Sequence, residues 1–336
     1  MIATVSQGVT RLGDARAVAD ACPSADAIGA AAAGQAGGEN FPVAFRLLPA
    51  RYRKRLEAVY GFARAVDDMG DEAPPGERVR LLDELEADLG RLYQFQDVSL
   101  RDAPGQAGPS ADQAGPVPDQ AGHTTDGARH RPPRIGVIRA LAPAVAGCTI
   151  PQQPFTDLIR ANRQDQVVTR YQTFDELAGY CELSANPVGR IVLHVFGAAT
   201  PDRIAASDRI CTALQLAEHW QDVAEDFAAG RIYLPGEDMD RFGCQEADLA
   251  ADRAAPQLKA LLAFEVRRAR ELLDAGAPLV GTLRGAARVA VAGYVAGGRA
   301  ALAAIAAAGY DVLQATPRPR RSRIVREALS IYAIGR

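Results

Sequence analysis

Hydrophobic residues recur at helical spacing along most of the chain. The clearest case is a helix over 81–92. Its apolar face consists of Leu81, Leu82, Leu85, Leu89 and Leu92. The charged residues lie largely on the opposite face: Asp83, Glu84, Glu86, Asp88 and Arg91. Segments 174–181, 203–228, 255–275 and 285–308 continue this pattern, whereas 188–196 is ambiguous between helix and strand. The pattern therefore predicts an all-α protein.

Two segments lack any hydrophobic period. Residues 1–38 are rich in Ala and Gly, and residues 101–134 contain Gln-Ala-Gly at 106–108, 113–115 and 120–122. The prolines around this repeat exclude a coiled-coil heptad, because proline breaks a helix. We expect a mobile tail at 1–38 and one folded domain over 39–336, interrupted by a flexible insertion at 101–134.

Small side chains dominate residues 285–308. Gly293 and Gly297 have the Gly-x-x-x-Gly spacing that lets helices approach closely, so we expect tight core packing there. Arg288 and Arg299 interrupt the apolar run, so no membrane-spanning helix is expected. The first residues lack the apolar core of a signal peptide, which favours a cytoplasmic protein.

Composition excludes several functional classes. A net charge of −3 and a pI of about 5.9 argue against a general nucleic-acid-binding protein. The five cysteines form no Cys-x-x-Cys pair and the four histidines form no zinc-binding spacing, so neither a disulfide framework nor a zinc site is expected. The chain also lacks a glycine-rich dinucleotide fingerprint, so no NADPH requirement is expected.

The first of two acidic segments covers residues 60–72. On a helix, Asp67 and Asp71 lie one turn apart and project together, and Arg64 lies one turn before Asp67 and Asp68. This arrangement places several carboxylates and one guanidinium along one stretch of helix.

The second acidic segment covers residues 215–226. Glu218, Asp222 and Asp226 recur every four residues and share one helix face. Like charges at this spacing destabilise an isolated helix by a few tenths of a kcal/mol per pair, and a bound cation would reverse the sign.

Carboxylates without Cys or His are the ligand set of Mg²⁺ or Mn²⁺, which usually bridge a few carboxylates to phosphate oxygens. Two facing acidic helices therefore predict a diphosphate site, with arginines supplying further positive charge. The expected metal ligands are Asp67, Asp71, Glu218, Asp222 and Asp226. The alternative, two solvated helix faces, is disfavoured because both clusters are embedded in apolar sequence.

These motifs resemble those of a known family. Arg64-x-x-Asp67-Asp68-x-x-Asp71 and Asp222-x-x-x-Asp226 are similar to the two acidic helices of the squalene/phytoene synthases, the head-to-head prenyl synthases. Blocks 40–49 (NFPVAFRLLP), 180–189 (YCELSANPVG) and 230–235 (GRIYLP) match in the same order. The resemblance covers roughly residues 39–336 and implies a single-domain isoprenoid synthase bundle with a central cavity between the two motifs.

Within the family, the chain most resembles bacterial hydroxysqualene synthases of hopanoid-type squalene pathways. The resemblance rests on Glu39-Asn-Phe-Pro-Val-Ala, Ser184-Ala-Asn-Pro-Val-Gly-Arg190, Trp220-Gln221-Asp222 and Gly297-Gly298. It departs from the family at Glu218, where close relatives tend to have Asn, and at the 101–134 insertion. Glu218 adds a negative charge beside the expected diphosphate.

The resemblance and the chemistry of the reaction imply roles for individual residues. Catalytic roles are expected for Asp67, Asp71, Asp222, Asp226 and Asn186. Substrate-binding roles are expected for Asn40, Phe41, Arg64, Asp68, Tyr180, Gln215, Gln221, Arg231 and Arg318. Metal and arginine would draw off the diphosphate, and an apolar pocket would keep the carbocation from bulk water.

Several of these assignments have open alternatives. Asn186 is expected to orient the quenching water or the diphosphate, and Pro187 after it predicts a helix break; a purely structural kink is the alternative. The expected pocket wall, with plain core packing as its alternative, consists of Phe41, Phe45, Leu183, Val188 and Leu216. His219 and Trp220 are expected to pack or cap.

The C-terminal basic run has three open interpretations. Its members are Arg318, Arg320, Arg321, Arg323 and Arg326. They could clamp diphosphate, contact anionic membrane lipid, or form a solvated tail.

The favoured function is Mg²⁺-dependent conversion of presqualene diphosphate to hydroxysqualene and diphosphate. Two alternatives stay open: a condensing prenyltransferase that joins two prenyl diphosphates, and a non-catalytic helical scaffold for isoprenoid enzymes. The expected partners are a polyisoprenoid diphosphate and other squalene-pathway enzymes, with peripheral contact at the inner face of the membrane and no nucleic acid.

Overall fold

The computed structural model describes residues 24–28, 48–101 and 131–334. Their longer elements are helices: α3 (Ala50–Asp67), η1 (Asp68–Glu72), α4 (Arg78–Arg101), α5 (Gly136–Cys148), α6 (Gln153–Gln164), α7 (Phe174–Ser184), α8 (Asn186–Val195), α9 (Pro201–Gln221), α10 (Val223–Ala228), α11 (Gly236–Phe242), η3 (Glu246–Ala250), α12 (Pro256–Gly276), α13 (Leu279–Thr282), α14 (Gly285–Ala307) and α15 (Arg321–Ile334). Within these ranges no strand occurs, and Arg170 and Ile232 form an isolated bridge. The all-α prediction is confirmed, and the ambiguous segment 188–196 belongs to helix α8.

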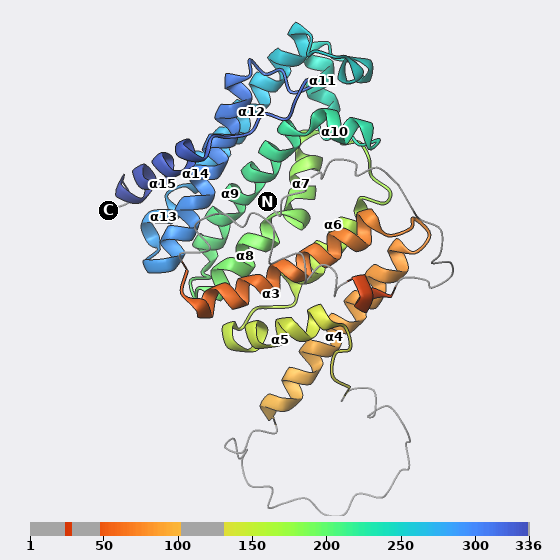
Figure 1. Ribbon diagram of the computed structural model, residues 1–336, viewed down its shortest axis with the longest axis vertical. Helices are drawn as coiled ribbons and strands as arrows, with labels where there is room; N and C mark the ends of the chain where they lie inside the picture. Colours follow the sequence, from red (N-terminus) through yellow and green to blue (C-terminus); the bar gives the residue numbers. More distant parts are fainter. Residues whose placement is uncertain (1–23, 29–47, 102–130, 335–336) are drawn as a thin grey trace, which may run out of the picture.

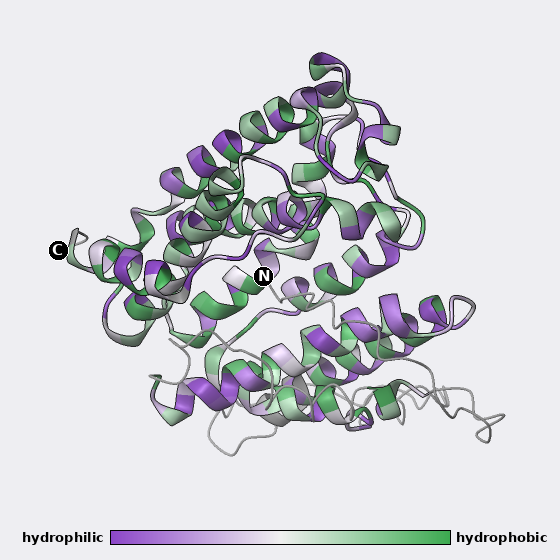
Figure 2. Cartoon of the chain, turned by 45° about the horizontal axis from the view of Figure 1, so that its top comes forward, coloured by the Kyte–Doolittle hydropathy of each residue, from purple (hydrophilic) through white to green (hydrophobic). Residues whose placement is uncertain are grey.

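The helices enclose two hydrophobic cores rather than one. Helices α3, α4, α5 and α6 surround the first core, and α7, α9, α12 and α14 surround the second. Figure 1 shows the two groups of helices on opposite sides of the bundle, with α8 between them. Hydrophobic and hydrophilic positions alternate along the ribbons of these helices (Figure 2), which is the pattern of helices that each bury one face.

Helix α8 connects the two cores. Ile191, Val192 and Val195 belong to the first core, whereas Leu193 belongs to the second. Tyr294 of α14 packs against both. The short helix α8 is therefore apolar on opposite sides because each side faces a different core.

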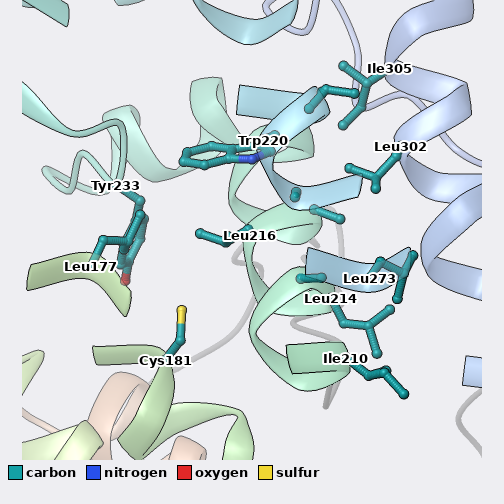
Figure 3. Packing of buried hydrophobic residues seen from close by; sticks show 14 of the residues in the cluster. Leu177, Cys181, Ile210, Leu214, Leu216, Trp220, Tyr233, Leu273, Leu302 and Ile305 are labelled. Carbon is teal, nitrogen blue, oxygen red and sulfur yellow. The ribbon is translucent and has the colours of Figure 1, made fainter. Parts of the chain in front are cut away.

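Helix α9 runs through the second core and divides its contacts. Figure 3 shows Ile210 and Leu214 on the side of α9 toward Leu273, and Leu216 on the side toward Leu177. Two glycines permit close approach of neighbouring helices: a Cβ on Gly189 would lie 2.5 Å from Cys211 Sγ, and a Cβ on Gly298 would lie 2.7 Å from Leu214 Cδ2. Any larger side chain at these positions would push α9 away from its neighbours.

The close contact of α14 differs from the predicted one. Gly297 has no heavy atom within 4 Å of where a Cβ would be, so this glycine does not make the tight contact. Gly298 does, because a Cβ there would lie 2.7 Å from Leu214 of α9 and 2.9 Å from Leu273 of α12. By length and composition α14 could cross a membrane, but 56% of its most apolar window is buried inside the fold.

Asp88 is a second difference from the sequence pattern. It was expected on the polar face of its helix, yet its side chain is completely buried. Its carboxylate accepts hydrogen bonds from the backbone amides of Arg134 and Ile135 at 2.7–3.0 Å and pairs with Arg91. These partners satisfy the buried charge, and they tie the chain that leaves the 101–134 insertion to α4.

A short helix at 25–28 also packs on this side of the molecule. Ala25 is buried in the first core, and Asp26 Oδ1 accepts a hydrogen bond of 2.7 Å from the Gly136 amide. The sequence pattern did not predict this helix. The other residues of the expected tail and residues 102–130 of the insertion lie outside the described residues.

Candidate active site

The first acidic motif is built where α3 changes its winding. Residues Asp68–Glu72 form a wider π-helical turn, closed by a hydrogen bond of 3.0 Å from the Ala73 amide to the Asp68 carbonyl. Gly70 lies inside this turn, where a Cβ would be 2.1 Å from Asn162 Oδ1. The glycine therefore allows α6 to approach the motif closely enough for Asn162 to contact it.

Within this motif, arginine and amide groups already engage the carboxylates. Arg64 Nε donates to Asp68 Oδ1 at 2.7 Å, and the same guanidinium contacts Glu72 at 3.1 Å. Asn162 Nδ2 donates to Asp67 Oδ1 at 3.3 Å. Burial raises the pKa of Asp67 to about 7; the Asn162 hydrogen bond opposes this rise, and the neighbouring Asp71 adds to it.

The second acidic motif spans a helix break rather than one continuous helix. Helix α9 ends at Gln221, Asp222 adopts φ −103° and ψ 18°, and α10 begins at Val223. The Asp226 amide still donates to the Asp222 carbonyl at 2.8 Å, so the two aspartates stay one turn apart. The continuous helix predicted over 203–228 is thus interrupted at the aspartate expected to bind metal.

Like charges dominate the surroundings of Asp222. Burial raises the pKa of Asp222 to about 7, and Glu225, Asp226 and Glu218 raise it further, while Arg318 opposes them. A cation placed here would be attracted by several carboxylates at once.

Arg231 links the two motifs. It follows Gly230, whose φ of +83° turns the chain after α10, and its NH1 donates to Asp71 Oδ1 at 3.0 Å. Asp165, just after α6, is close enough to Arg231 for the guanidinium to lower its pKa, while Asp71 and Asp226 raise it. Burial is the largest cause, and the pKa of Asp165 reaches about 7. Groups from both acidic motifs therefore converge around Arg231 and Asp165.

Two buried atoms at this meeting point have no hydrogen-bond partner. They are Asp165 Oδ1 and Arg231 Nε. The other carboxylate oxygen of Asp165 accepts a hydrogen bond of 2.9 Å from the Tyr180 hydroxyl. Unpaired buried polar atoms are costly in a folded protein, so these two atoms are candidates to bind a polar ligand.

Aromatic rings cover this charged centre on one side. His219 stacks on Tyr233 with ring centroids 3.7 Å apart, and Tyr171 and Tyr180 lie within 6 Å of Tyr233. His219 Nδ1 lies 3.9 Å from Asp226 Oδ2, and its Nε2 lies 3.3 Å from Gln215 Nε2. Packing was the expected role of His219, and its ring is indeed buried in this cluster.

An apolar pocket lies between α8, α9 and α14. It has a volume of about 50 Å³ and is lined by Ala185, Val188, Gly189, Val192, Leu193, Ser207, Ile210, Cys211, Leu214, Val291 and Tyr294. Of the expected wall residues, Val188 lines it, whereas Leu216 is fully buried in the second core and Leu183 packs against that core. Phe41 and Phe45 lie outside the described residues.

Asn186 begins α8 beside this pocket. The predicted helix break is present, because α7 ends at Ser184 and α8 starts at Asn186. The side chain is buried, and the Thr212 hydroxyl donates to Asn186 Oδ1 at 3.0 Å. This contact holds the amide in one orientation and leaves Nδ2 as the end that can donate to a ligand.

The segment before α15 covers the second motif. The Gln221 side chain donates to the Pro317 carbonyl, and Thr316 Oγ1 donates to Glu225 Oε1 at 3.0 Å. Arg318 follows, near enough to lower the pKa of Asp222. Gln221 thus fastens this segment in the structure, and its expected role in substrate binding stays a prediction.

The structure thus brings together the expected residues Asp67, Asp71, Tyr180, Gln215, Glu218, Asp222, Asp226, Arg231 and Arg318. Arg64 and Asp68 pair with each other, and Asn40 lies outside the described residues. Sequence reasoning missed Asp165 and Asn162. The signal was weak: Asn162 and Asp165 fall three residues apart in the polar end of an amphipathic helix, without an acidic neighbour to draw attention to them.

The described residues contain no ready-made group of three or more His, Cys, Asp or Glu side chains that could hold a metal ion. The carboxylates instead face each other from two motifs, with an unpaired oxygen on Asp165 between them. This donor set fits an Mg²⁺ ion that is bound jointly by protein carboxylates and substrate phosphate, rather than one held in a protein cage.

Comparisons with known proteins show which family the chain belongs to. The profile of the squalene/phytoene synthase family matches residues 35–325. A hydroxysqualene synthase from Rhodopseudomonas palustris is 34% identical over 251 residues, which cover 73% of this chain and 72% of that protein. A phytoene synthase from Mycobacterium tuberculosis is 29% identical over 245 residues, covering 72% of this chain and 68% of that protein.

Solved structures resemble the whole bundle. The squalene synthase HpnC from Alicyclobacillus acidocaldarius superimposes with a TM-score of 0.68 at 35% identity, over 84% of this chain and 94% of that one. A dehydrosqualene synthase gives a TM-score of 0.71 at 24% identity, over 92% of this chain and 97% of the other. The second likeness concerns the fold alone.

Proposed function

Because the chain belongs to the squalene/phytoene synthase family, whose enzymes process prenyl diphosphates, we propose that it converts presqualene diphosphate to hydroxysqualene and diphosphate. The water-quenched reaction is favoured over condensation because the relatives at 34% and 31% identity over nearly three quarters of the chain are hydroxysqualene synthases. The phytoene synthases that match over the same length are 29% identical.

One observation carries the proposal: groups from both acidic motifs converge on Arg231 and Asp165. The bundle also contains an apolar pocket between α8, α9 and α14. A substrate with a charged head and a hydrocarbon body needs both of these environments. Arg231 would bind diphosphate oxygens through its guanidinium, and the unpaired Nε is a further donor for them.

Leaving-group departure requires positive charge at the diphosphate. Asp67 and Asp71 from one motif, with Glu218, Asp222 and Asp226 from the other, would hold Mg²⁺. When bound, the ion would stabilise the negative charge of the departing diphosphate. The protein side chains would hold the diphosphate in place and, at Arg231, share its charge.

The hydrocarbon part of the cation must avoid early contact with water. Val188, Leu214 and Tyr294 line the pocket between α8, α9 and α14 and would exclude bulk solvent. Asn186, whose amide is oriented by Thr212, would direct the single water molecule that ends the reaction.

Product analysis in labelled water tests the proposal. Purified protein is incubated with presqualene diphosphate and Mg²⁺ in H₂¹⁸O, with and without NADPH, and the products are identified by mass spectrometry. We expect an ¹⁸O-labelled alcohol whose yield does not depend on NADPH. A hydrocarbon formed only with NADPH, or accumulation of presqualene diphosphate from farnesyl diphosphate alone, would replace the proposal with a reductive or a condensing reaction.

Two variants separate the role of Asn186 from that of the fold. Asn186→Ala should still release diphosphate but shift the products from alcohol toward eliminated or rearranged species. Thr212→Val, which keeps the side-chain size but removes the orienting hydroxyl, should cause a smaller shift in the same direction. An unchanged product ratio in both variants would leave Asn186 as a structural residue at the helix break.

A further inference from the structure

Helix α15 lies at the edge of the bundle beside α14 (Figure 1). Its inner face contributes Ile331 to the second core, and Ile324 and Ala328 pack against that core. Arg288 of α14 fastens the helix by donating to the Tyr332 carbonyl at 2.7 Å and by placing its guanidinium 4.6 Å from the Tyr332 ring. These contacts bury the one apolar face that a surface helix needs for packing against the protein.

The outer face of α15 is apolar as well. Val325 is 54% exposed and Leu329 is 68% exposed, and Ala333 one turn further is also exposed. Residues four apart lie on one face of a helix, so these three side chains form a continuous apolar stripe. A helix that needs only one apolar face for its packing thus presents a second one to its surroundings.

Positive charge is concentrated around this stripe. Residues 315–336 contain six arginines and one acidic residue, although the whole chain carries a net charge of −3. Arg320, Arg323 and Arg326 are exposed. The apolar stripe is therefore bordered by cations at its N-terminal end.

We propose that α15 is a docking helix for an anionic lipid surface. The arginines would contact phospholipid headgroups, and Val325 and Leu329 would enter the apolar boundary beneath them. An acidic protein partner fits less well, because a stripe of three side chains on one short helix is far smaller than the roughly 1,200 Å² that a stable protein interface buries.

The location of α15 gives such docking a use at the active site. Thr316 and Pro317 contact the second acidic motif, Arg318 lowers the pKa of Asp222, and α15 begins three residues later. Docking would hold this side of the site close to the surface from which a polyisoprenoid diphosphate must enter. This use rests on the proposed function, but vesicle binding does not, so the two can fail separately.

Flotation with lipid vesicles tests the docking directly. The full-length protein is mixed with vesicles of phosphatidylcholine alone, or with 30 mol% phosphatidylglycerol added, at low and high salt. We expect binding to the anionic vesicles that weakens at high salt. The double variants Val325→Ser with Leu329→Ser, and Arg323→Gln with Arg326→Gln, should each weaken the binding by on the order of tenfold.

Matched controls distinguish docking through α15 from non-specific adsorption to vesicles. Val79→Ser removes a side chain that is 51% exposed on α4, and Arg209→Gln removes an exposed arginine of α9; neither should change vesicle binding. Turnover of detergent-solubilised substrate should be the same in the docking variants and the wild type. The proposal would be overturned if the wild type did not bind, if all variants bound equally, or if the controls lost as much binding as the docking variants. Retention on an acidic protein matrix but not on vesicles would assign the stripe to a protein partner.

Discussion

The two acidic motifs differ in how the fold balances their negative charge. In the first, Arg64 pairs with Asp68 and Glu72, Arg231 pairs with Asp71, and Asn162 contacts Asp67. In the second, Glu225 contacts the hydroxyl of Thr316, Asp226 lies 3.9 Å from His219, and Arg318 lies near enough to lower the pKa of Asp222 without offsetting burial and the neighbouring acids.

This difference separates two tasks within one site. In the first motif, each aspartate has an arginine or amide partner from the protein itself. The second gathers like charges around Asp222, whose pKa they raise together with burial. A cation would therefore gain most at the second motif, and the first would serve to complete its coordination and to position Arg231.

The largest expected effect comes from removing one charge of the second motif. Asp222→Asn should lower turnover by about 10³-fold, because stabilisation of the leaving group is lost. Its thermal stability should be equal to or above that of the wild type, since the substitution also removes like-charge repulsion. Turnover is measured at saturating Mg²⁺ and stability by thermal unfolding.

Asp67→Asn should reduce turnover similarly, and it should also raise the stability at pH 8, because burial raises the pKa of Asp67 to about 7 in spite of the Asn162 hydrogen bond. Asp240→Asn on the exposed surface of α11 is the control and should change neither property. Near-normal turnover in both motif variants would contradict the proposal that the two acidic motifs form the active site.

Removing the link between the motifs should have the next largest effect. Arg231→Gln should lower turnover by about 10²-fold. It should also raise the pKa of Asp165, because in the wild type the guanidinium opposes the effects of burial and neighbouring acids on that pKa. The acid limb of the pH–rate profile should move to higher pH.

Arg299→Gln breaks an exposed pair with Asp274 and provides the matched control. If Arg231→Gln lowered turnover without moving the pH profile, its role would be confined to binding the diphosphate.

A smaller effect concerns stability as a function of pH. Asp67, Asp165 and Asp222 have pKa values of about 7 in the folded protein, against 3.8 ordinarily. Between about pH 4 and pH 7 the folded state therefore holds more protons than the unfolded chain, so the free energy of unfolding falls as pH rises through this window. Each such group should contribute a loss of roughly 2–3 kcal/mol from pH 5 to pH 8 in the presence of EDTA, measured by urea unfolding.

Added Mg²⁺ should restore most of this loss at pH 8, since a ligand of the folded state stabilises it. Glu265 offers an internal comparison, because burial raises its pKa to about 8 in a cluster with Asp238 and Arg268 outside the site. Glu265→Gln should flatten the pH dependence without changing the response to Mg²⁺. A pH slope that Mg²⁺ leaves untouched would assign the loss to such structural carboxylates.

The smallest effect is expected at Glu218, the first acid of the four-residue series in the second motif. Glu218→Asn removes a charge that raises the pKa of Asp222, so Asp222 should ionise at lower pH. Because one attractive charge is also lost, the Mg²⁺ concentration for half-maximal turnover should change by only a few-fold at pH 8. Glu182→Gln, an exposed substitution on α7, should leave that concentration unchanged; a change above tenfold would make Glu218 a principal ligand.

The sequence predicted the helices well, because apolar periodicity reports which face is buried. It also predicted the break before α8 from Pro187. It did not predict the break at Asp222, since no proline or glycine marks it and the four-residue spacing of acids looks like an uninterrupted helix. The contact at Gly298 was equally hidden, because which glycine of a small-residue run faces a neighbour depends on helix rotation.

Within the site, spacing identified the carboxylates but not their partners. The role of Gln221 in holding Pro317, and the presence of Asp165 beside Arg231, depend on contacts between segments far apart in the chain. Such contacts leave no local pattern, so a single sequence cannot supply them.

The contacts of Asp88 make the fold insensitive to the length of the 101–134 segment. Because its carboxylate holds the amides of Arg134 and Ile135, the two ends of the 101–134 segment are fixed by the protein body rather than by the length of chain between them. Doubling the length of such a connection costs only about 0.6 kcal/mol in closure entropy. The 101–134 segment should therefore tolerate inserted sequence. A peptide epitope, a fluorescent reporter or a linker placed there should leave the packing of the two helical cores unchanged.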